Sequence, residues 1–266
     1  MDLFDAIFFR KSIRKYADHP LPPEVLETIR NLCGKSETLY EKIPIRVHIV
    51  ESGQDIQHLG GTLIGNYTKV KAPHYLVVTS EETDGYLENI GYALEHLILQ
   101  LTSMGIGTCW IGGMVKGCPL DRIVPIDKNH IPVMVIAFGA PFHEGELTAN
   151  IVESKKRKEI KEFVEGAMDK DLLRIMDSVR LAPSSMNSQP WRFSVKDSEI
   201  DVYARIRGFL GIRPLELLNR IDVGIALCHF AVASAHFSMP FSFRRLSGRE
   251  RDGLSYITTI QRISFI

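Results

Sequence analysis

A degenerate internal repeat is the feature that most constrains how this chain of 266 residues can fold. The segment Arg10–Tyr16 has an echo in Arg157–Phe163, and the same offset superimposes the apolar positions of two predicted helices: Leu26, Ile29 and Leu32 fall on Leu173, Met176 and Val179. Further along, Asn89–Leu94 matches Asp222–Leu227 with a shorter spacer. Helical periodicity alone produces chance matches, but these occur in a common order. The repeat therefore predicts two diverged copies of one α+β unit, residues 1–154 and a shortened 155–266.

Charge and cysteine content exclude several classes of function. Lysine and arginine number 32, as do aspartate and glutamate, so no global field directs the chain to nucleic acid or to a membrane surface. The first five residues carry acid where a signal peptide has a basic flank, and no apolar run suggests a membrane span, so we expect a cytoplasmic protein. The four cysteines lie far apart without a C-x-x-C pair, which argues against a metal site and a disulfide framework.

The most specialised stretch is Pro183–Trp191, which combines turn formers, small hydroxyls, amides and a tryptophan. Helical spacing precedes it and strand alternation follows it, so it is predicted to be a loop between a helix and a strand. Loops held by rigid flanks often carry binding groups. Ser184, Ser185 and Asn187 can each donate or accept a hydrogen bond, which suits the edge of a flat heteroaromatic ring. The alternative is an ordinary Asx or Ser turn with a buried Trp191 behind it.

A second candidate site lies at Arg10–Tyr16. If the first helix continues here, Arg10 and Arg14 share a face, whereas an extended chain puts Ser12 on the same face as both. In either case the arginines converge, and two guanidinium groups beside a hydroxyl suit a phosphate or a cluster of ring carbonyls. The alternative is a solvated basic face.

The two copies keep different parts of these motifs. In the first copy, Ser36–Tyr40 replaces the proline and the amides of the loop, and in the second copy Glu159 and Lys161 replace Ser12 and Arg14. An added carboxylate would repel a phosphate. The sequence therefore predicts one composite site between the two halves.

Periodicity predicts the other elements. Helices are expected from Asp2 through Phe8, and in the segments 25–32, 94–104, 173–180 and 225–233. Strands are expected at 45–50, 75–79, 131–138, 192–195, 200–205 and 254–263. We interpret Cys109–Gly113 as a glycine-rich turn. The basic run Lys155–Glu159 is interpreted as the solvated start of a helix through Ile160 and Phe163. The polar face of the long helix at 94–104, with His96, could meet another helix or water.

Three motifs in their order along the chain resemble the flavin-dependent nitroreductase superfamily: Arg10–Arg14, Gly107–Gly113 after a long helix, and Ala182–Trp191. More narrowly, the chain is similar to a group in which an internally duplicated chain mimics the usual homodimer. The resemblance covers nearly the whole sequence. It implies an α+β, nitroreductase-like three-layer fold, arranged as a pseudo-dimer with FMN at the interface of its two halves.

The resemblance also implies cofactor-binding residues by position. Those from the first half and the following basic run would hold the phosphate and ribityl chain or approach the ring: Arg10, Lys11, Ser12, Arg14, Asn66, Lys69, Lys155 and Arg157. Those from the second half would line the isoalloxazine: Pro183, Ser184, Ser185 and Asn187. Arg14 is the candidate catalytic residue, because a fixed cation stabilises negative charge that develops on reduction of the ring.

The implied activity is hydride transfer from NAD(P)H through FMN to a nitroaromatic, a quinone or a similar small acceptor in a ping-pong cycle. Two alternatives remain open from the residues: a flavin-binding sensor or carrier without turnover, and an interaction module that has lost the flavin. Since one chain supplies both halves of the site, we expect a monomer.

Overall fold

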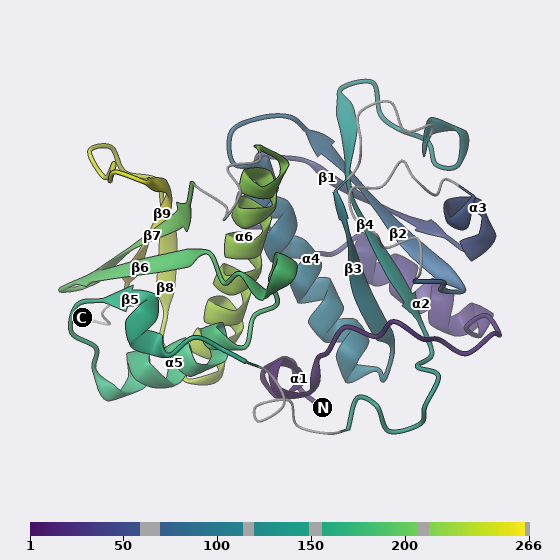
Figure 1. Cartoon of the computed structure of the whole chain (residues 1–266), viewed down its shortest axis with the longest axis horizontal. Helices are drawn as coiled ribbons and strands as arrows, with labels where there is room; N and C mark the ends of the chain where they lie inside the picture. The colour runs from purple at the N-terminus through teal and green to yellow at the C-terminus, as the bar shows by residue number, and fades with distance from the viewer. Residues whose placement is uncertain (59–69, 114–119, 149–155, 207–212, 264–266) are drawn as a thin grey trace. The chain divides into compact units, whose positions relative to one another are not determined.

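The computed structural model describes residues 1–58, 70–113, 120–148, 156–206 and 213–263, which form two compact units (Figure 1). Unit 1 comprises Met1–Glu37, Glu41–Tyr86 and His96–Ile151, and unit 2 comprises Thr38–Tyr40, Leu87–Glu95 and Val152–Ile266. Unit 2 thus includes two short segments that the sequence places in the first half. The expected boundary at residues 154 and 155 lies outside the described residues.

Unit 1 is built on a four-stranded antiparallel sheet. Its elements in chain order are α1 (Leu3–Phe9), α2 (Pro23–Cys33), β1 (Ile45–Val50), α3 (Gly53–Gln57), β2 (His74–Glu81), α4 (Tyr86–Ser103), β3 (Gly107–Gly113) and β4 (His130–Gly139). The strand order is β1-β2-β4-β3. Asp2 caps α1 by accepting a hydrogen bond from the Asp5 N–H at 2.7 Å, as its position before the apolar run predicts. All but the last residue of the central strand β2 are buried.

Unit 2 is built on a five-stranded sheet. Its elements are β5 (Val164–Glu165), α5 (Lys170–Arg180), β6 (Trp191–Lys196), β7 (Glu199–Arg205), α6 (Arg213–His236), β8 (Phe241–Arg244) and β9 (Leu254–Arg262). The strand order is β5-β6-β7-β9-β8, and only β5 runs parallel to its neighbour. Helix α6 packs against β6 and β7, and α5 packs against α6. Trp191 and Phe193 of β6 meet Phe163 edge to face in the core.

Within unit 2, the first half of α4 crosses α6 at two glycines. A Cβ atom at Gly91 would lie 2.1 Å from the Ile221 carbonyl oxygen, and one at Gly224 would lie 2.0 Å from the Glu88 carbonyl oxygen. Both positions therefore need glycine, because any side chain would push the two backbones apart. Residues 87–99 of α4 are all buried, so the polar face predicted for this helix does not meet water.

Three expectations about local structure are wrong. Residues 107–113 form strand β3 in place of a turn, because Thr108, Trp110 and Ile111 favour extended backbone and Gly112, at φ 119°, accommodates a bulge in the pairing with β4. The basic run does not start a regular helix: Ile160–Glu162 forms one 3-10 turn, and β5 follows directly.

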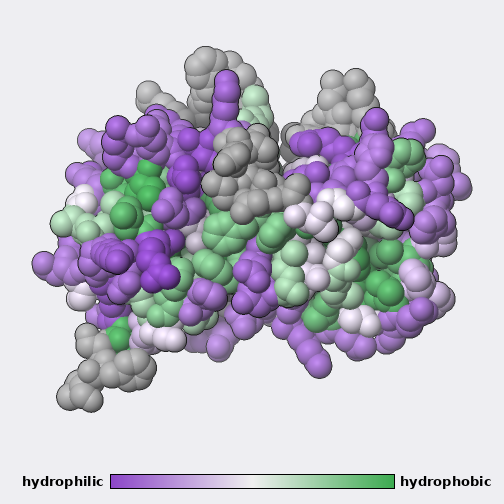
Figure 2. Space-filling model, turned by 90° about the horizontal axis from the view of Figure 1, so that it is seen from below, coloured by the Kyte–Doolittle hydropathy of each residue, from purple (hydrophilic) through white to green (hydrophobic). Residues whose placement is uncertain are grey.

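The third wrong expectation is that no segment is long and apolar enough to suggest a membrane span. The segment Glu216–His236 of α6 is long and apolar enough to cross a membrane by composition, although none was expected. In its apolar window, however, 72% of the residues are buried within the protein, as in the core helix of a globular domain. On the face drawn in Figure 2, hydrophilic residues cover most of the described surface and hydrophobic residues show in smaller areas between them.

Candidate functional site

The arginine motif of unit 1 is extended. Helix α1 ends at Phe9, and the next residue, Arg10, has an extended backbone with φ −63° and ψ 120°. Ser12 then makes a parallel bridge to Thr108 of β3, and the Ile13 N–H donates to the Thr108 carbonyl at 2.8 Å. Of the two conformations that the sequence left open, the extended one is present.

The motif places positive charge beside β3. Arg10 is only 1% exposed, whereas Arg14 is exposed. Burial raises the pKa of the Cys109 thiol, and the positive charges of Arg14 and Arg10 both act in the opposite direction, so both guanidinium groups lie within electrostatic range of this side chain. The convergence of the two arginines on one ligand stays a prediction. Lys11 is paired with Glu146, at 3.5 Å from Nζ to Oε2.

The loop of unit 2 has an unusual backbone. Residues Ser185–Asn187 form a 3-10 turn in which Met186 has φ 51°, and Asn187 and Gln189 have φ 56° and 49°. Residues other than glycine rarely adopt this left-handed region, and each such residue costs about 1–3 kcal/mol. Conformations of this kind persist only where surrounding contacts impose them. The loop is thus more than an ordinary turn.

Some of these contacts come from the basic segment that precedes β5. Arg157 donates from Nη1 to Asn187 Oδ1 at 2.5 Å and from Nη2 to the Leu181 carbonyl at 2.9 Å. The Asn187 amide donates to the Lys156 carbonyl at 2.8 Å. The Lys158 N–H donates to Gln189 Oε1 at 2.8 Å. The structure therefore brings together two residues that the sequence assigned to one site, Arg157 and Asn187.

Inside the loop, the Gln189 N–H donates to the Ser184 hydroxyl oxygen at 3.0 Å. Pro183, Ser184 and Ser185 are half-buried, and Asn187 is exposed. Three other predicted ligands, Asn66, Lys69 and Lys155, lie outside the described residues.

Sequence reasoning missed one residue, Asp222 of α6. Its carboxylate is buried, and both oxygens accept from the Ser185 N–H, at 3.1 Å and 3.0 Å. Burial raises the pKa of this carboxyl to about 8, and the Ser185 hydrogen bond opposes that shift. A signal was available, because Asp222 is an acid between the apolar residues Ile221 and Val223.

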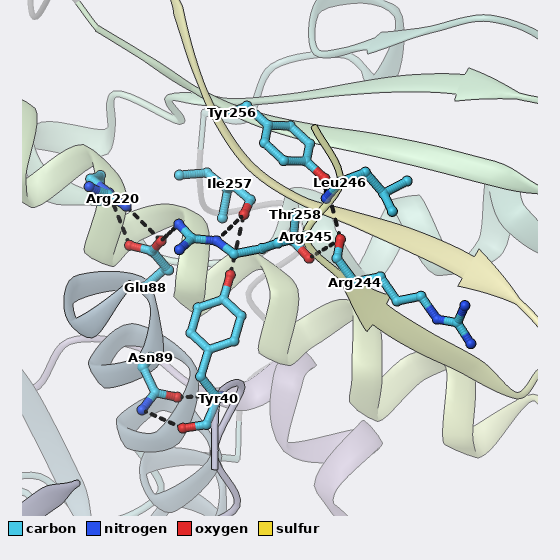
Figure 3. A network of polar contacts seen from close by, with 10 residues as sticks. All are labelled: Tyr40, Glu88, Asn89, Arg220, Arg244, Arg245, Leu246, Tyr256, Ile257 and Thr258. Carbon is cyan, nitrogen blue, oxygen red and sulfur yellow. Dashed lines mark hydrogen bonds and ion pairs between the residues drawn. The ribbon is translucent and has the colours of Figure 1, made fainter. Parts of the chain in front are cut away.

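The position equivalent to Asp222 in the repeat is Asn89, which has a similar contact. The Tyr40 N–H donates to Asn89 Oδ1 at 2.8 Å, so each polar helix residue accepts from the backbone of the loop segment in its own copy. Figure 3 shows a polar network around Tyr40. The Cζ atom of Arg245 lies 5.3 Å from the centre of the Tyr40 ring. Arg245 and Arg220 both contact the buried carboxylate of Glu88, at 3.3 Å and 2.8 Å. The loop segment of the first copy thus lies beside a network of paired charges to which both copies contribute, Glu88 from the first and Arg220 and Arg245 from the second.

Other polar features of the described chain carry no comparable signal. A cleft of about 410 Å³ in unit 2 is lined by Asp201, Arg249 and Arg251, among others. Arg249 pairs with Asp201 and Glu199, and Arg251 pairs with Glu165. Among the residues that the structure describes, no cluster of acids, histidines and cysteines could hold a metal ion. Cys33, Cys109 and Cys228 are free thiols.

The donor set fits FMN chemically. Arg10, Lys11 and Ser12 offer two cations and a hydroxyl, which suit a phosphate, although a phosphate would compete with Glu146 for Lys11. In unit 2, Ser184 keeps a hydroxyl proton to donate, because its oxygen is the acceptor for Gln189.

Comparisons with known proteins agree with this fold. The crystal structure of a "putative nitroreductase" from Thermotoga maritima matches with a TM-score of 0.62 and 22% identity, covering 99% of this chain and 94% of that one. The fold is therefore the α+β nitroreductase fold. A family model described as "Putative TM nitroreductase" matches residues 2–234, and the chain belongs to that family.

A curated relative from Methanothermobacter thermautotrophicus is also similar. It is described as "Putative NADH dehydrogenase/NAD(P)H nitroreductase" and is 27% identical over 158 residues, which is 53% of this chain and 78% of the relative. The prediction that the chain belongs to an oxidoreductase family is confirmed.

Proposed function

We propose that the chain is an FMN-dependent oxidoreductase that passes a hydride from NAD(P)H to a nitroaromatic, a quinone or a similar small acceptor in a ping-pong cycle. The observation that carries the proposal is the loop Pro183–Trp191 of unit 2, in a chain that belongs to the nitroreductase family. The backbone of this loop is strained, and two predicted flavin ligands, Arg157 and Asn187, are in contact there. Strain of this kind is commonly retained at ligand sites.

FMN, when bound, supplies the redox chemistry, since it accepts a hydride from one substrate and returns it to another. The residues of the chain have three tasks. Arg10, Lys11 and Ser12 bind the phosphate and ribityl chain. Ser184 and Asn187 orient the edge of the ring. Arg14 offers a fixed positive charge where negative charge develops on reduction, which lowers the barrier to hydride transfer.

We also propose that the chain is an internal duplication with one composite site drawn from both copies. Each sheet has the order first, second, fourth, third among its four antiparallel strands, β1-β2-β4-β3 and β6-β7-β9-β8. The glycine contacts of α4 and α6 are reciprocal in the repeat. Gly91 faces Ile221, and Gly224, which is equivalent to Gly91, faces Glu88, which is equivalent to Ile221. This pattern is that of a two-fold symmetric contact between like surfaces, and it supports a fused dimer.

The first test is the visible spectrum of the purified protein, followed by release and identification of any yellow cofactor. One FMN per chain supports the composite site, and bleaching by NAD(P)H supports turnover. A yellow protein that NAD(P)H never bleaches would favour a sensor or carrier. A colourless protein that takes up no added FMN would refute the proposal.

Variants then test the individual ligands. Arg10→Ala should weaken FMN binding by about 1.5–3 kcal/mol, because it removes a charge-assisted contact to phosphate. Arg14→Ala should slow reduction by NAD(P)H at saturating flavin more than it weakens flavin affinity. Arg46→Ala is a matched control for the loss of one charge, since Arg46 is exposed and pairs with Asp127 in unit 1. If Arg10→Ala and Arg46→Ala bind FMN equally well, the phosphate lies elsewhere.

A further inference from the structure

The contact between Asp222 and Ser185 links the middle of α6 to the strained loop. The Asp222 carboxylate is buried, and within the described part of the chain the backbone N–H of Ser185 is its only hydrogen-bond donor. Ser185 precedes Met186 and Asn187, two of the residues with positive φ. The contact therefore lies where the chain enters its unfavourable conformation.

Among the residues that the structure describes, no cation pairs with this carboxyl group. Arg220, one turn earlier on α6, pairs with Glu88 of α4. On α5, Arg180 pairs with Asp177. Arg157, which holds the far side of the loop, donates to Asn187 and Leu181. A buried carboxylate without a cation is expensive, and core positions of this kind are normally apolar. Its retention is explained if the loop conformation depends on it.

We propose that Asp222 is a positioning residue for the flavin loop: its carboxylate fixes the Ser185 amide and so holds Ser184 and Asn187 in the geometry that receives the isoalloxazine edge. The part that concerns the ring rests on the proposed function. The part that concerns the loop does not, because it depends only on contacts within the chain. Asp222 acts through the backbone and touches no reacting atom.

The first experiment measures hydrogen exchange of the Ser185 amide by NMR in the flavin-free protein. Asp222→Ala should accelerate exchange by up to about tenfold, because the hydrogen bond from the Ser185 N–H to the buried carboxyl group is lost. Ser234→Ala is the matched control: Ser234 is buried on the same helix, and its hydroxyl has no hydrogen-bond partner among the described residues, so exchange at Ser185 should not change. Equal exchange in wild type and Asp222→Ala would overturn the inference.

Asp222→Asn keeps the volume and one oxygen acceptor but cannot ionise, so it serves if the alanine variant fails to fold. Because the pKa of Asp222 is raised to about 8, the Ser185 amide resonance of the wild type should shift with a midpoint near pH 8. In Asp222→Asn the resonance should stay constant over that range. A wild-type resonance that does not titrate, or one that titrates identically in Asp222→Asn, would overturn the inference.

Titration with FMN separates this inference from the proposed function. Asp222→Ala should raise the Kd for FMN by about tenfold or more, with Asp222→Asn between it and the wild type and Ser234→Ala equal to the wild type. FMN binding that is identical in the wild type and Asp222→Ala would overturn the inference and leave the proposed function intact. A wild type that binds no FMN, but whose Ser185 amide depends on Asp222, would refute the proposed function and support the role of Asp222 in the loop.

Discussion

Glu88 offers the sharpest test of what stabilises unit 2. Its side chain is 0% exposed, and Arg220 holds it with two hydrogen bonds, from Nε at 3.0 Å and from Nη2 at 2.8 Å. Arg245 adds a third contact at 3.3 Å and also donates to the Ile257 carbonyl (Figure 3). Removing one partner of a buried ion pair costs about 3–5 kcal/mol, because the remaining charge is left uncompensated. The two arginines are 26% and 34% exposed, so water offsets part of that cost.

We therefore expect Glu88→Ala to lower the free energy of unfolding by about 3 kcal/mol, at the lower end of the range for buried pairs. A double-mutant cycle with Arg220→Ala should give a coupling energy of about 2 kcal/mol. Urea unfolding can be followed by tryptophan emission in a Trp110→Phe background, since Trp191 of unit 2 is then the only tryptophan and is fully buried.

Glu165→Ala is the control for this measurement. Glu165 pairs with Arg251 in the same unit, but its side chain is 68% exposed, and the loss of a surface pair should cost less than about 1 kcal/mol. If Glu88→Ala costs no more than Glu165→Ala, or if the coupling between Glu88 and Arg220 is near zero, then the network does not stabilise unit 2 as we infer.

Three further changes have definite expected outcomes. Gly91→Ala should destabilise unit 2 by about 1–3 kcal/mol in urea unfolding, because its methyl group meets a backbone oxygen of α6, whereas Gly34→Ala, whose nearest such neighbour is 3.7 Å away, should change stability by less than about 1 kcal/mol. Glu95→Gln should be tolerated, because His229 donates from Nδ1 to a carbonyl and a glutamine amide can donate to its Nε2. Glu95→Ala leaves Nε2 buried and unpaired and should lower the free energy of unfolding by about 1–3 kcal/mol. Equal losses in the two variants would refute the placement of the imidazole proton on Nδ1. Asp222 keeps its proton up to about pH 8 in the folded state but loses it near pH 4 when unfolded, so it makes stability fall as pH rises between these values, by up to about 1.4 kcal/mol per pH unit. Asp222→Asn should therefore gain stability relative to the wild type from pH 5 to pH 8, and a pH-independent difference between the two would contradict the raised pKa.

Periodicity predicted the regular elements well because burial imposes it. Helix α5 and strands β6 and β7 lie where spacing placed them, and β9 ends one residue before the expected end. Local glycine content misled the prediction for β3, since the pairing of this strand with β4 depends on residues more than twenty positions away. Strand β8 escaped notice because four residues are too few to show alternation.

The sequence indicates residues for the candidate site but not the contacts between them. The sequence identified Arg157 and Asn187 separately, yet it gave no reason to pair them, because thirty residues of chain lie between them. Asp222 was visible as a member of the repeat and as an acid between apolar residues. Its role depends on which face of α6 meets the loop, and helical spacing does not specify the partner of a face. Asn66, Lys69 and Lys155 stay predictions.

The division of α4 between the units determines how the protein can be dissected. A fragment that begins at residue 152 would lack Leu87–Glu95 and Thr38–Tyr40, so Arg220 and Arg245 would lose their shared carboxylate and Gly224 would face an empty groove. Expressed alone, that fragment should be insoluble or associate with itself, and the complementary fragment supplied in trans should rescue it. If the chain arose by gene fusion, the two copies have since lost the ability to fold independently.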